Sequence, residues 1–232
     1  MENLFLKYMD ERFEQTEAQD VDRIPGPVIT ISRVCGCSAT LIAEMLTEKI
    51  NKSKVKKGQP TQWRWINKEI MAVASQELKI HPTQVKEIAE SNDKNFVSEI
   101  VSSFTETYYA HSTRVKKVIE EVIREIAYQG NVVIVGRASG IITSDIAQSL
   151  HVNLEAPLSW RINFISSKRN LNATDAKKYV LQMDKQRAAF KEHYLPKNHE
   201  TPEYDLSLNC KTLSLDQICE IIYKAAVLKN LL

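Results

Sequence analysis

Two runs made only of β-branched side chains most strongly constrain the fold of this 232-residue chain, VITI at 28–31 and VVIV at 132–135. A strand that is apolar on both faces belongs inside a parallel sheet covered by helices on both sides. Two further strands are predicted at 150–154 and 204–208, and a brief extended segment at 62–66. The chain therefore has enough strands for a mainly parallel sheet of five.

Helical segments are predicted between and after these strands. They cover residues 38–50, 112–129, 157–168, 173–194 and 214–230. A polar, basic linker is expected over 51–60, because this stretch reads NKSKVKKGQP. Strands that alternate with helices along a chain indicate an α/β protein. The sequence thus predicts a three-layer α/β sandwich around a mainly parallel five-stranded sheet.

The same pattern divides the chain into a core and two additions. Residues 67–110 look helical throughout and are set apart from the alternating pattern. The predicted division is a core of 1–59, 112–167 and 201–232, a helical insertion at 60–111 and a lid at 168–200. Within the core, residues 1–24 form an N-terminal arm. This arm is expected to pack on its own domain, with a homodimer through it as the alternative.

Charge and cysteine content exclude several function classes. The 31 Lys and Arg against 29 Asp and Glu give a net charge of +2, which argues against a nucleic-acid coat and a polybasic membrane binder. The four cysteines show no zinc-ligand spacing, and the acidic N-terminus resembles no targeting signal. No apolar stretch has the length of a membrane span. We therefore expect free thiols, a cytoplasmic location and neither a nucleic-acid nor a membrane partner.

The candidate site follows the first strand. Ligands of open α/β sheets bind beyond the carboxyl ends of the strands, which points to residues 32–40 and 136–140. A strand, a glycine-containing turn and a helix form the frame of a phosphate-binding loop. In such a loop, backbone N–H groups and the helix N-terminus hold phosphates, a lysine adds charge, and a Ser or Thr hydroxyl holds Mg²⁺.

Five segments resemble one family in serial order. ISRVCGCSATLIAEMLTEKI looks like the first strand, loop and helix of the cytidylate kinase-like branch of the P-loop nucleoside monophosphate kinases. WRWINKEI, GNVVIVGRASGII, LHVNLEAPLSWRINFI and the stretch from DKQRAAFKEHYLP to the last helix resemble its later segments. The resemblance covers about residues 27–228. It implies that fold, with ATP and Mg²⁺ as cofactors and CMP or dCMP as the nucleotide partner.

The phosphate loop departs from the full P-loop motif. Laid on this chain, the motif retains a glycine at Gly36, but Ser38 replaces its next glycine and Ala39 its lysine. Thr40 keeps the hydroxyl for Mg²⁺, and Arg33 can partly replace the missing charge. The resemblance assigns the ATP-binding role to Arg33, Gly36, Cys37, Ser38, Ala39 and Thr40. The alternative is a P-loop fold with an idle loop.

The remaining site residues also come from the resemblance. Arg137 follows a buried strand and corresponds to an arginine that binds the monophosphate. Asp184 and Arg187 correspond to a D-x-x-R pair on the lid helix that reaches the acceptor nucleotide. Arg161 corresponds to an arginine at the lid border, and Asn67 occupies an acidic position of the family pattern. Arg137, Arg161 and Arg187 are thus the expected catalytic residues, and Asn67, Arg137, Asp184 and Arg187 the expected substrate-binding ones.

Ordinary structural roles remain open for some of these residues. Arg137 can form a salt bridge, and Asp184 with Arg187 can form an ion pair on a helix surface. The expected function is transfer of the ATP γ-phosphoryl group to CMP or dCMP. The alternatives are a kinase-fold binding or regulatory protein with impaired catalysis, and a kinase for another small-molecule acceptor.

Overall fold

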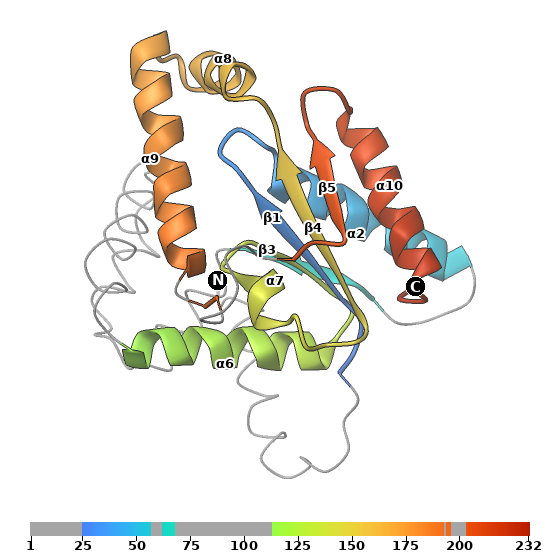
Figure 1. Ribbon diagram of the computed structural model, residues 1–232. Coiled ribbons are helices and arrows are strands. Elements are labelled where there is room, and N and C mark those ends of the chain that lie inside the picture. The colour runs from blue at the N-terminus through green and yellow to red at the C-terminus, as the bar shows by residue number, and fades with distance from the viewer. Residues whose placement is uncertain (1–24, 57–61, 68–112, 193, 196–202) are drawn as a thin grey trace, which may run out of the picture.

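The computed structural model describes residues 25–56, 62–67, 113–192, 194–195 and 203–232, which are the coloured parts of Figure 1. The predicted N-terminal arm and most of the predicted insertion lie outside these ranges. The predicted homodimer and domain division therefore stay predictions.

A parallel sheet of five strands forms the centre of the molecule. The strands are β1 (Val28–Arg33), β2 (Arg64–Ile66), β3 (Val132–Val135), β4 (Ser149–Glu155) and β5 (Leu206–Asn209). Their spatial order is β2-β3-β1-β4-β5, and all four pairings are parallel. The central strand β1 is paired on both edges, since Val28 lies opposite both Val132 and Ser149. The predicted five-stranded parallel sheet is confirmed.

Helices cover both faces of this sheet. The described helices are α2 (Ala39–Lys56), α6 (Thr113–Gln129), α7 (Ser139–Ile142), α8 (Leu158–Arg169), α9 (Ala173–Glu192) and α10 (Leu215–Leu228), of which α2 and α10 cover one face and α6 and α7 the other. Side chains alternate along β1, so that Ile29 and Ile31 join the core beneath α2 and α10, whereas Val28 joins the core beneath α6 and α7. In Figure 1 the two helix layers lie on opposite sides of the strands. This arrangement is the predicted three-layer sandwich.

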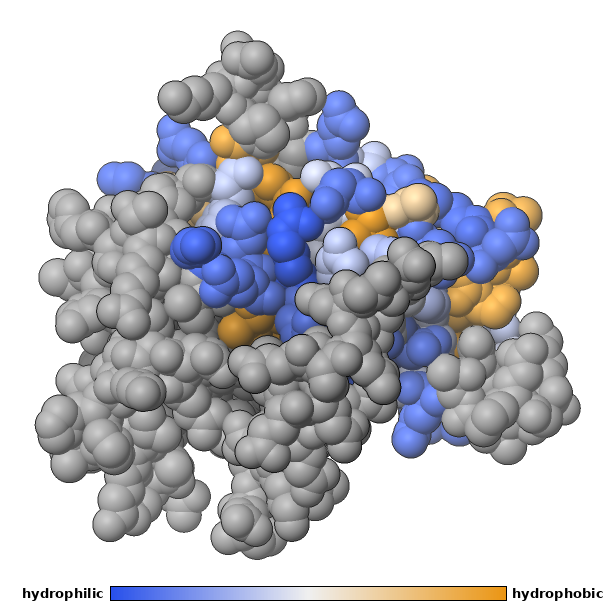
Figure 2. All heavy atoms as spheres, turned by 90° about the horizontal axis from the view of Figure 1, so that it is seen from below, coloured by the Kyte–Doolittle hydropathy of each residue, from blue (hydrophilic) through white to orange (hydrophobic). Residues whose placement is uncertain are grey.

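The outer surface of the α6 layer is polar. Figure 2 views the molecule from the side on which α6 lies in Figure 1, and its described surface is mainly hydrophilic. Lys117 and Glu121 pair along the exposed side of α6, whereas Ile119, Ile123 and Ile126 are completely buried. This division explains why α6 shows the expected amphipathic pattern. None of the described helices combines the length and the apolarity needed to cross a lipid bilayer.

Helix α2 is longer than the sequence predicts. It continues to Lys56, so the predicted linker is wrong for residues 51–56. The Asn51 side chain donates to the Trp63 carbonyl at 2.9 Å and accepts from the Trp63 amide at 2.8 Å. Ser53 accepts a hydrogen bond from the Tyr223 hydroxyl at 2.8 Å. These contacts with distant residues anchor a helical turn whose local composition favours a loop.

Helices α8 and α9 pack together around a small core of their own. Ile165 of α8, Ala176 and Val180 of α9 and Cys35 are the buried members of this cluster. Because Cys35 lies two residues after the last residue of β1, the cluster joins the two helices to the end of the central strand. Helix α9 lies in the predicted lid segment.

The fold predicts a large difference between two identical substitutions in the helices on one face of the sheet. Leu46→Ala in α2 removes a completely buried side chain from the core, so it should lower the free energy of unfolding by about 2–5 kcal/mol. Leu228→Ala at the end of α10 removes a side chain that is 82% exposed and should change it by about 0.5 kcal/mol at most. Urea unfolding of both variants measures the difference. Equal losses would contradict the placement of α2 against the sheet.

Candidate functional site

The loop between β1 and α2 alternates between buried and accessible residues. Cys35, Cys37 and Ala39 are each at most 8% exposed, whereas residues 36, 38 and 40 reach the surface. Gly36 adopts a φ of +97°, and a Cβ atom there would lie 3.2 Å from Cβ of Arg161. The retained glycine is therefore required both by the backbone conformation and by the arginine that packs beneath it.

The backbone N–H groups of the loop also alternate, between hydrogen-bonded and free. The Cys37 amide donates to the Val34 carbonyl at 3.4 Å, and the Ala39 amide donates to the Cys37 carbonyl at 2.9 Å. Within the described ranges, the amides of Gly36, Ser38 and Thr40 have no hydrogen-bond partner. Free amides beside the N-terminus of an 18-residue helix can receive an anion.

The side chains of Cys37, Ser38 and Ala39 differ in their exposure to solvent and in their surroundings. Ala39 is 2% exposed, so the position that corresponds to the P-loop lysine points into the core. Ser38 is partly exposed on the open side of the loop. A hydrogen bond with Cys210, together with burial, raises the pKa of the Cys37 thiol. The loop can therefore offer its backbone and the Ser38 hydroxyl to a ligand, but no charged side chain of its own between residues 34 and 40.

The structure brings Thr40 and Asn67 together at the same edge of the sheet. The Asn67 side-chain amide donates to the Thr40 hydroxyl at 3.0 Å, although the two residues come from α2 and the segment after β2. The Thr40 side chain is exposed, so its oxygen is accessible from solvent. These two predicted residues thus form one polar border of the loop.

Arg33 supplies positive charge beside the loop. Its guanidinium fills the space next to Gly136, where a Cβ atom would lie 1.6 Å from Nη1 of Arg33. Burial, and then the nearby charges of Arg187 and Arg137, lower the pKa of Arg33 to about 9. Within the described part of the chain, Arg33 forms no ion pair. An anion at this position would offset the positive charge of Arg33.

Arg137 is held in an unusual backbone conformation. Gly136, Arg137 and Ala138 have φ values of 77°, 58° and 57°, which place three successive residues in the left-handed region. Non-glycine residues in this region carry strain of about 1–3 kcal/mol each, and such strain clusters at functional sites. The turn directs the chain from β3 into α7, and the Arg137 guanidinium lies 6.0 Å from the Phe190 ring of α9.

Arg187 of α9 completes this arrangement. Its Nη1 atom lies 3.5 Å from the Arg33 carbonyl and donates to it. The three arginines therefore come from the end of β1, the turn after β3 and the face of α9. We call Arg33, Arg137 and Arg187 the arginine cluster. The sequence predicts all three as site residues, and the structure brings them together.

Arg161 and Asp184 lie next to the loop but bind protein atoms. Arg161 is 8% exposed, and its Nη1 atom lies 2.5 Å from Oδ2 of Asp184. Its Nε atom donates to the Ala156 carbonyl at 2.9 Å, and Nη1 also donates to the Cys35 carbonyl at 3.3 Å. Asp184 accepts the Cys35 amide at 2.6 Å. Both residues are thus bound to the backbone of the loop.

Two further residues reach the end of β1 without having been predicted as site residues. The Lys191 ammonium donates to the Tyr204 hydroxyl at 3.1 Å, and this hydroxyl donates to the Ser32 hydroxyl at 3.1 Å. Ser32, Lys191 and Tyr204 also line a small cavity beside Gly136 and Gly140. Lys191 shares the α9 stripe of Asp184 and Arg187, which is a sequence signal for it. Nothing near Tyr204 in the sequence indicates this contact.

The side chains offer little to a metal ion by themselves. No group of three His, Cys, Asp or Glu residues in the described ranges could hold one. Thr40 is the predicted ligand, and its exposed hydroxyl leaves room for a cation that is also held by phosphate oxygens. This fits Mg²⁺, which usually keeps several waters and binds through few protein ligands together with substrate phosphates.

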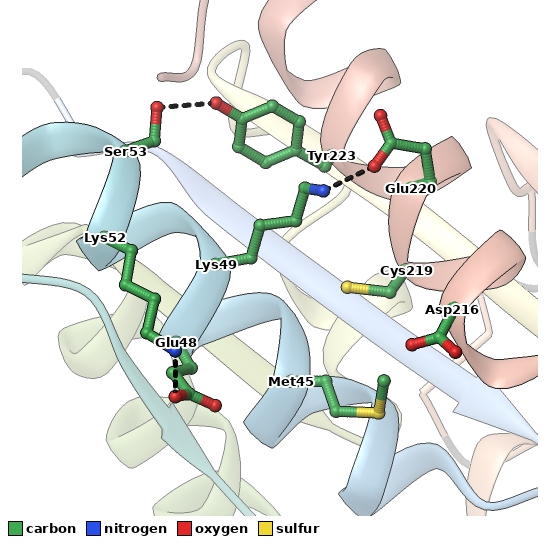
Figure 3. Close-up of a pocket in the computed structure, with 9 residues that line it drawn as sticks. All are labelled: Met45, Glu48, Lys49, Lys52, Ser53, Asp216, Cys219, Glu220 and Tyr223. Atoms are coloured by element: carbon green, nitrogen blue, oxygen red, sulfur yellow. Dashed lines mark hydrogen bonds and ion pairs between the residues drawn. The ribbon is translucent and has the colours of Figure 1, made fainter. Parts of the chain in front are cut away.

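A larger groove lies away from these residues, between α2 and α10. It has a volume of about 610 Å³ and is lined by the side chains drawn in Figure 3. Lys49 pairs with Glu220 across it, and Lys52 pairs with Glu48 along α2. No residue that the sequence predicts for the site lines this groove. The groove therefore lies apart from the predicted site.

The chain is similar to several known proteins. A cytidylate kinase from Methanocaldococcus jannaschii is 27% identical over 201 residues, which cover 85% of this chain and 96% of that protein. The solved structure of an uncharacterized protein from Eubacterium ventriosum has a TM-score of 0.59 at 18% identity, over 86% of this chain and 97% of that chain. A shikimate kinase from Bacteroides thetaiotaomicron has a TM-score of 0.49 at 12% identity, over 86% and 97% of the two chains.

The Eubacterium structure supports the same fold over most of the chain. The sequence also matches the cytidylate kinase-like family over residues 28–212. This match begins at the first residue of β1 and ends after β5, so it contains the whole sheet and every residue of the arginine cluster. The chain therefore belongs to the cytidylate kinase-like family, which supports a nucleotide kinase-like function.

Proposed function

We propose that this protein transfers the γ-phosphoryl group of ATP to CMP or dCMP. The observation that carries the proposal is the convergence of Arg33, Arg137 and Arg187 beside the free loop amides. A cluster of three guanidinium groups at the carboxyl edge of a parallel sheet is suited to phosphate groups. Nucleotides are also what membership in the cytidylate kinase-like family implies.

ATP is expected at the loop. The amides of Gly36, Ser38 and Thr40 and the N-terminus of α2 offer hydrogen bonds and a positive field to its phosphates. Arg33 takes over the charge that a P-loop lysine usually supplies. Mg²⁺, when bound with ATP, neutralises charge on the phosphates, and Thr40 is the residue that would reach it.

The acceptor monophosphate is expected between Arg137 and Arg187. Each guanidinium can donate two parallel hydrogen bonds to phosphate oxygens, which fixes orientation as well as charge. Asn67 is proposed to contact the base or ribose at the border of the loop. Phosphoryl transfer depends mainly on positioning and charge stabilisation, and these are the tasks that the arginine cluster can perform. Closure of the proposed lid at 168–200 would exclude water.

One observation favours a second candidate function, which is nucleotide binding without transfer. Ala39 occupies the lysine position and is buried in the core, so the loop has no side chain that can follow the transferring phosphoryl group. In this case the arginine cluster would hold a nucleotide, and binding would serve a regulatory role. The two candidates share a binding site and differ in turnover.

Melting temperatures and a transfer assay together test both candidates. With CMP or Mg²⁺–ATP at 100 times its dissociation constant, binding should add about 2.7 kcal/mol to the free energy of unfolding and raise the melting temperature. Formation of CDP and ADP from the two nucleotides would support the kinase, and stabilisation without product would support the binding protein. The absence of any stabilisation by nucleoside mono- and triphosphates at millimolar concentration would contradict both.

The lowered pKa of Arg33 predicts how phosphate affinity depends on pH. A bound phosphate favours the protonated guanidinium, so affinity should be complete below the free-state pKa of about 9 and decline as the pH rises through it. The monophosphate itself keeps its full charge above its second pKa of about 6. Calorimetric titration of CMP and Mg²⁺–ATP between pH 7.5 and 10 measures this decline.

Arg33→Gln provides the control for the pH experiment. This variant should bind phosphates more weakly than the unaltered protein, and its affinity should change less between pH 8 and 10, because the titrating group is absent. The same decline in both proteins would show that another group titrates, and equal affinities of the two proteins at pH 7.5 would show that Arg33 has no part in binding.

A further inference from the structure

The ion pair between Arg161 and Asp184 binds both backbone polar groups of Cys35, its N–H and its carbonyl. Cys35 donates its amide to Oδ1 of Asp184 at 2.6 Å and accepts at its carbonyl from Nη1 of Arg161 at 3.3 Å. Arg161 and Asp184 are joined to each other at 2.5 Å. The backbone of Cys35 is therefore bound on both sides immediately before Gly36, where the free amides of the loop begin.

This ion pair is built into the structure rather than lying on the surface. The Arg161 and Asp184 side chains are 10% and 23% exposed, and Nε of Arg161 is fixed by the Ala156 carbonyl at 2.9 Å. The aliphatic part of Arg161 packs beneath Gly36, because a Cβ atom added to Gly36 would lie 3.2 Å from Cβ of Arg161. A largely buried pair whose arginine is also held by backbone carbonyls fixes geometry well.

We infer that Arg161 and Asp184 are positioning residues that clamp Cys35 and so hold the phosphate loop with its free amides facing outward. This inference rests on the proposed role of the loop in binding phosphate. It differs from the roles that the family resemblance implies, in which Asp184 contacts the acceptor nucleotide and Arg161 the transferring phosphoryl group. We call the ion pair with Cys35 the Cys35 clamp.

The hydrogen bonds that the Asp184 carboxylate already accepts support a positioning role over a role in binding the nucleotide. Both of its carboxylate oxygens already accept charge-assisted or backbone hydrogen bonds, one from Arg161 and one from Cys35. A sugar hydroxyl could use only the remaining lone pairs of a carboxylate that is 23% exposed. The clamp also explains how a loop without the usual second glycine and lysine keeps a defined shape, because Arg161 and Asp184 fix its backbone at Cys35.

The Cys35 clamp further connects the loop to the predicted lid. Arg161 belongs to α8 and Asp184 to α9, and these helices pack together around Cys35, Ile165, Ala176 and Val180. A movement of α9 relative to the sheet would therefore pull on the backbone of Cys35. The position of α9 and the orientation of the loop amides are thereby coupled.

Asp184→Asn tests the clamp by removing the charge while nearly preserving shape. Loss of a charge-assisted hydrogen bond corresponds to about a ten- to hundredfold change, so amide hydrogen exchange in residues 35–40 should accelerate by at least tenfold. Affinity for inorganic tripolyphosphate, which has no sugar or base, should fall by a similar factor. Asp175→Asn, an exposed carboxylate on the same helix, should change neither quantity.

Asp184→Asn leaves the buried Arg161 without its carboxylate partner and could unfold the protein for that reason, so a second variant is needed. Arg161→Met with Asp184→Leu removes both charges, and such replacements usually keep a protein folded. It should also accelerate exchange at residues 35–40 and weaken tripolyphosphate. Melting temperatures of both variants, compared with Asp175→Asn, separate this local effect from general destabilisation.

Two results would overturn the clamp. Unchanged exchange at residues 35–40 in both folded variants would show that the ion pair does not hold the loop. Loss of CMP affinity in Asp184→Asn with unchanged tripolyphosphate affinity would make Asp184 a nucleotide ligand. By contrast, faster exchange in a protein that binds neither tripolyphosphate nor nucleotide would support the clamp and contradict the proposed function instead.

Discussion

The structure depends on the burial of strand β1 at the centre of the sheet. β1 is hydrogen-bonded on one edge to β3 and on the other to β4, and its residues 28–31 are at most 1% exposed. Such a strand cannot shift without breaking two ladders and two cores. Its carboxyl end is therefore a fixed point, and the phosphate loop, Arg33 and the Cys35 clamp all extend from it.

The arginines near this fixed point differ in whether a carboxylate neutralises their charge. On one side of the loop, the charge of Arg161 is neutralised by Asp184 and serves the backbone of Cys35. On the other side, Arg33 lies near Arg137 and Arg187 with no carboxylate of the described residues paired to it, and its pKa falls to about 9. Maintaining this cluster costs folding energy, which an anionic ligand would recover. Perturbed groups of this kind are typical of binding sites.

Much of this arrangement could be predicted from the sequence, because its signals are local. Four consecutive β-branched residues define β3 at 132–135 without any structural information. The turn after β1 is recognisable from Gly36 and the amphipathic helix that follows. Two members of the arginine cluster are predictable for a related reason, since parallel strands place their carboxyl ends at one edge and Arg33 and Arg137 both lie there. Arg187 lies on α9 and is predicted only by the family resemblance.

What the sequence could not provide depends on contacts between distant segments. The extension of α2 past Asn51 requires Trp63 and Tyr223, which lie 12 and 170 residues from their partners in the helix. The burial of Ala39 depends on how the start of α2 faces the core. The pairing of Arg161 with Asp184 joins two helices, whereas spacing along α9 alone suggested a link between Asp184 and Arg187.

The most direct test of the arginine cluster is to measure the affinities of Arg137→Ala for CMP and for Mg²⁺–ATP by calorimetry. Arg124→Ala is the matched control, because Arg124 pairs with Asp145 on the surface of the α6 layer. The account predicts that Arg137→Ala weakens CMP binding by about 1.5–3 kcal/mol, weakens ATP binding much less, and that Arg124→Ala changes neither. Equal weakening of both nucleotides by Arg137→Ala, or the same loss in Arg124→Ala, would contradict the placement of the acceptor phosphate in the arginine cluster.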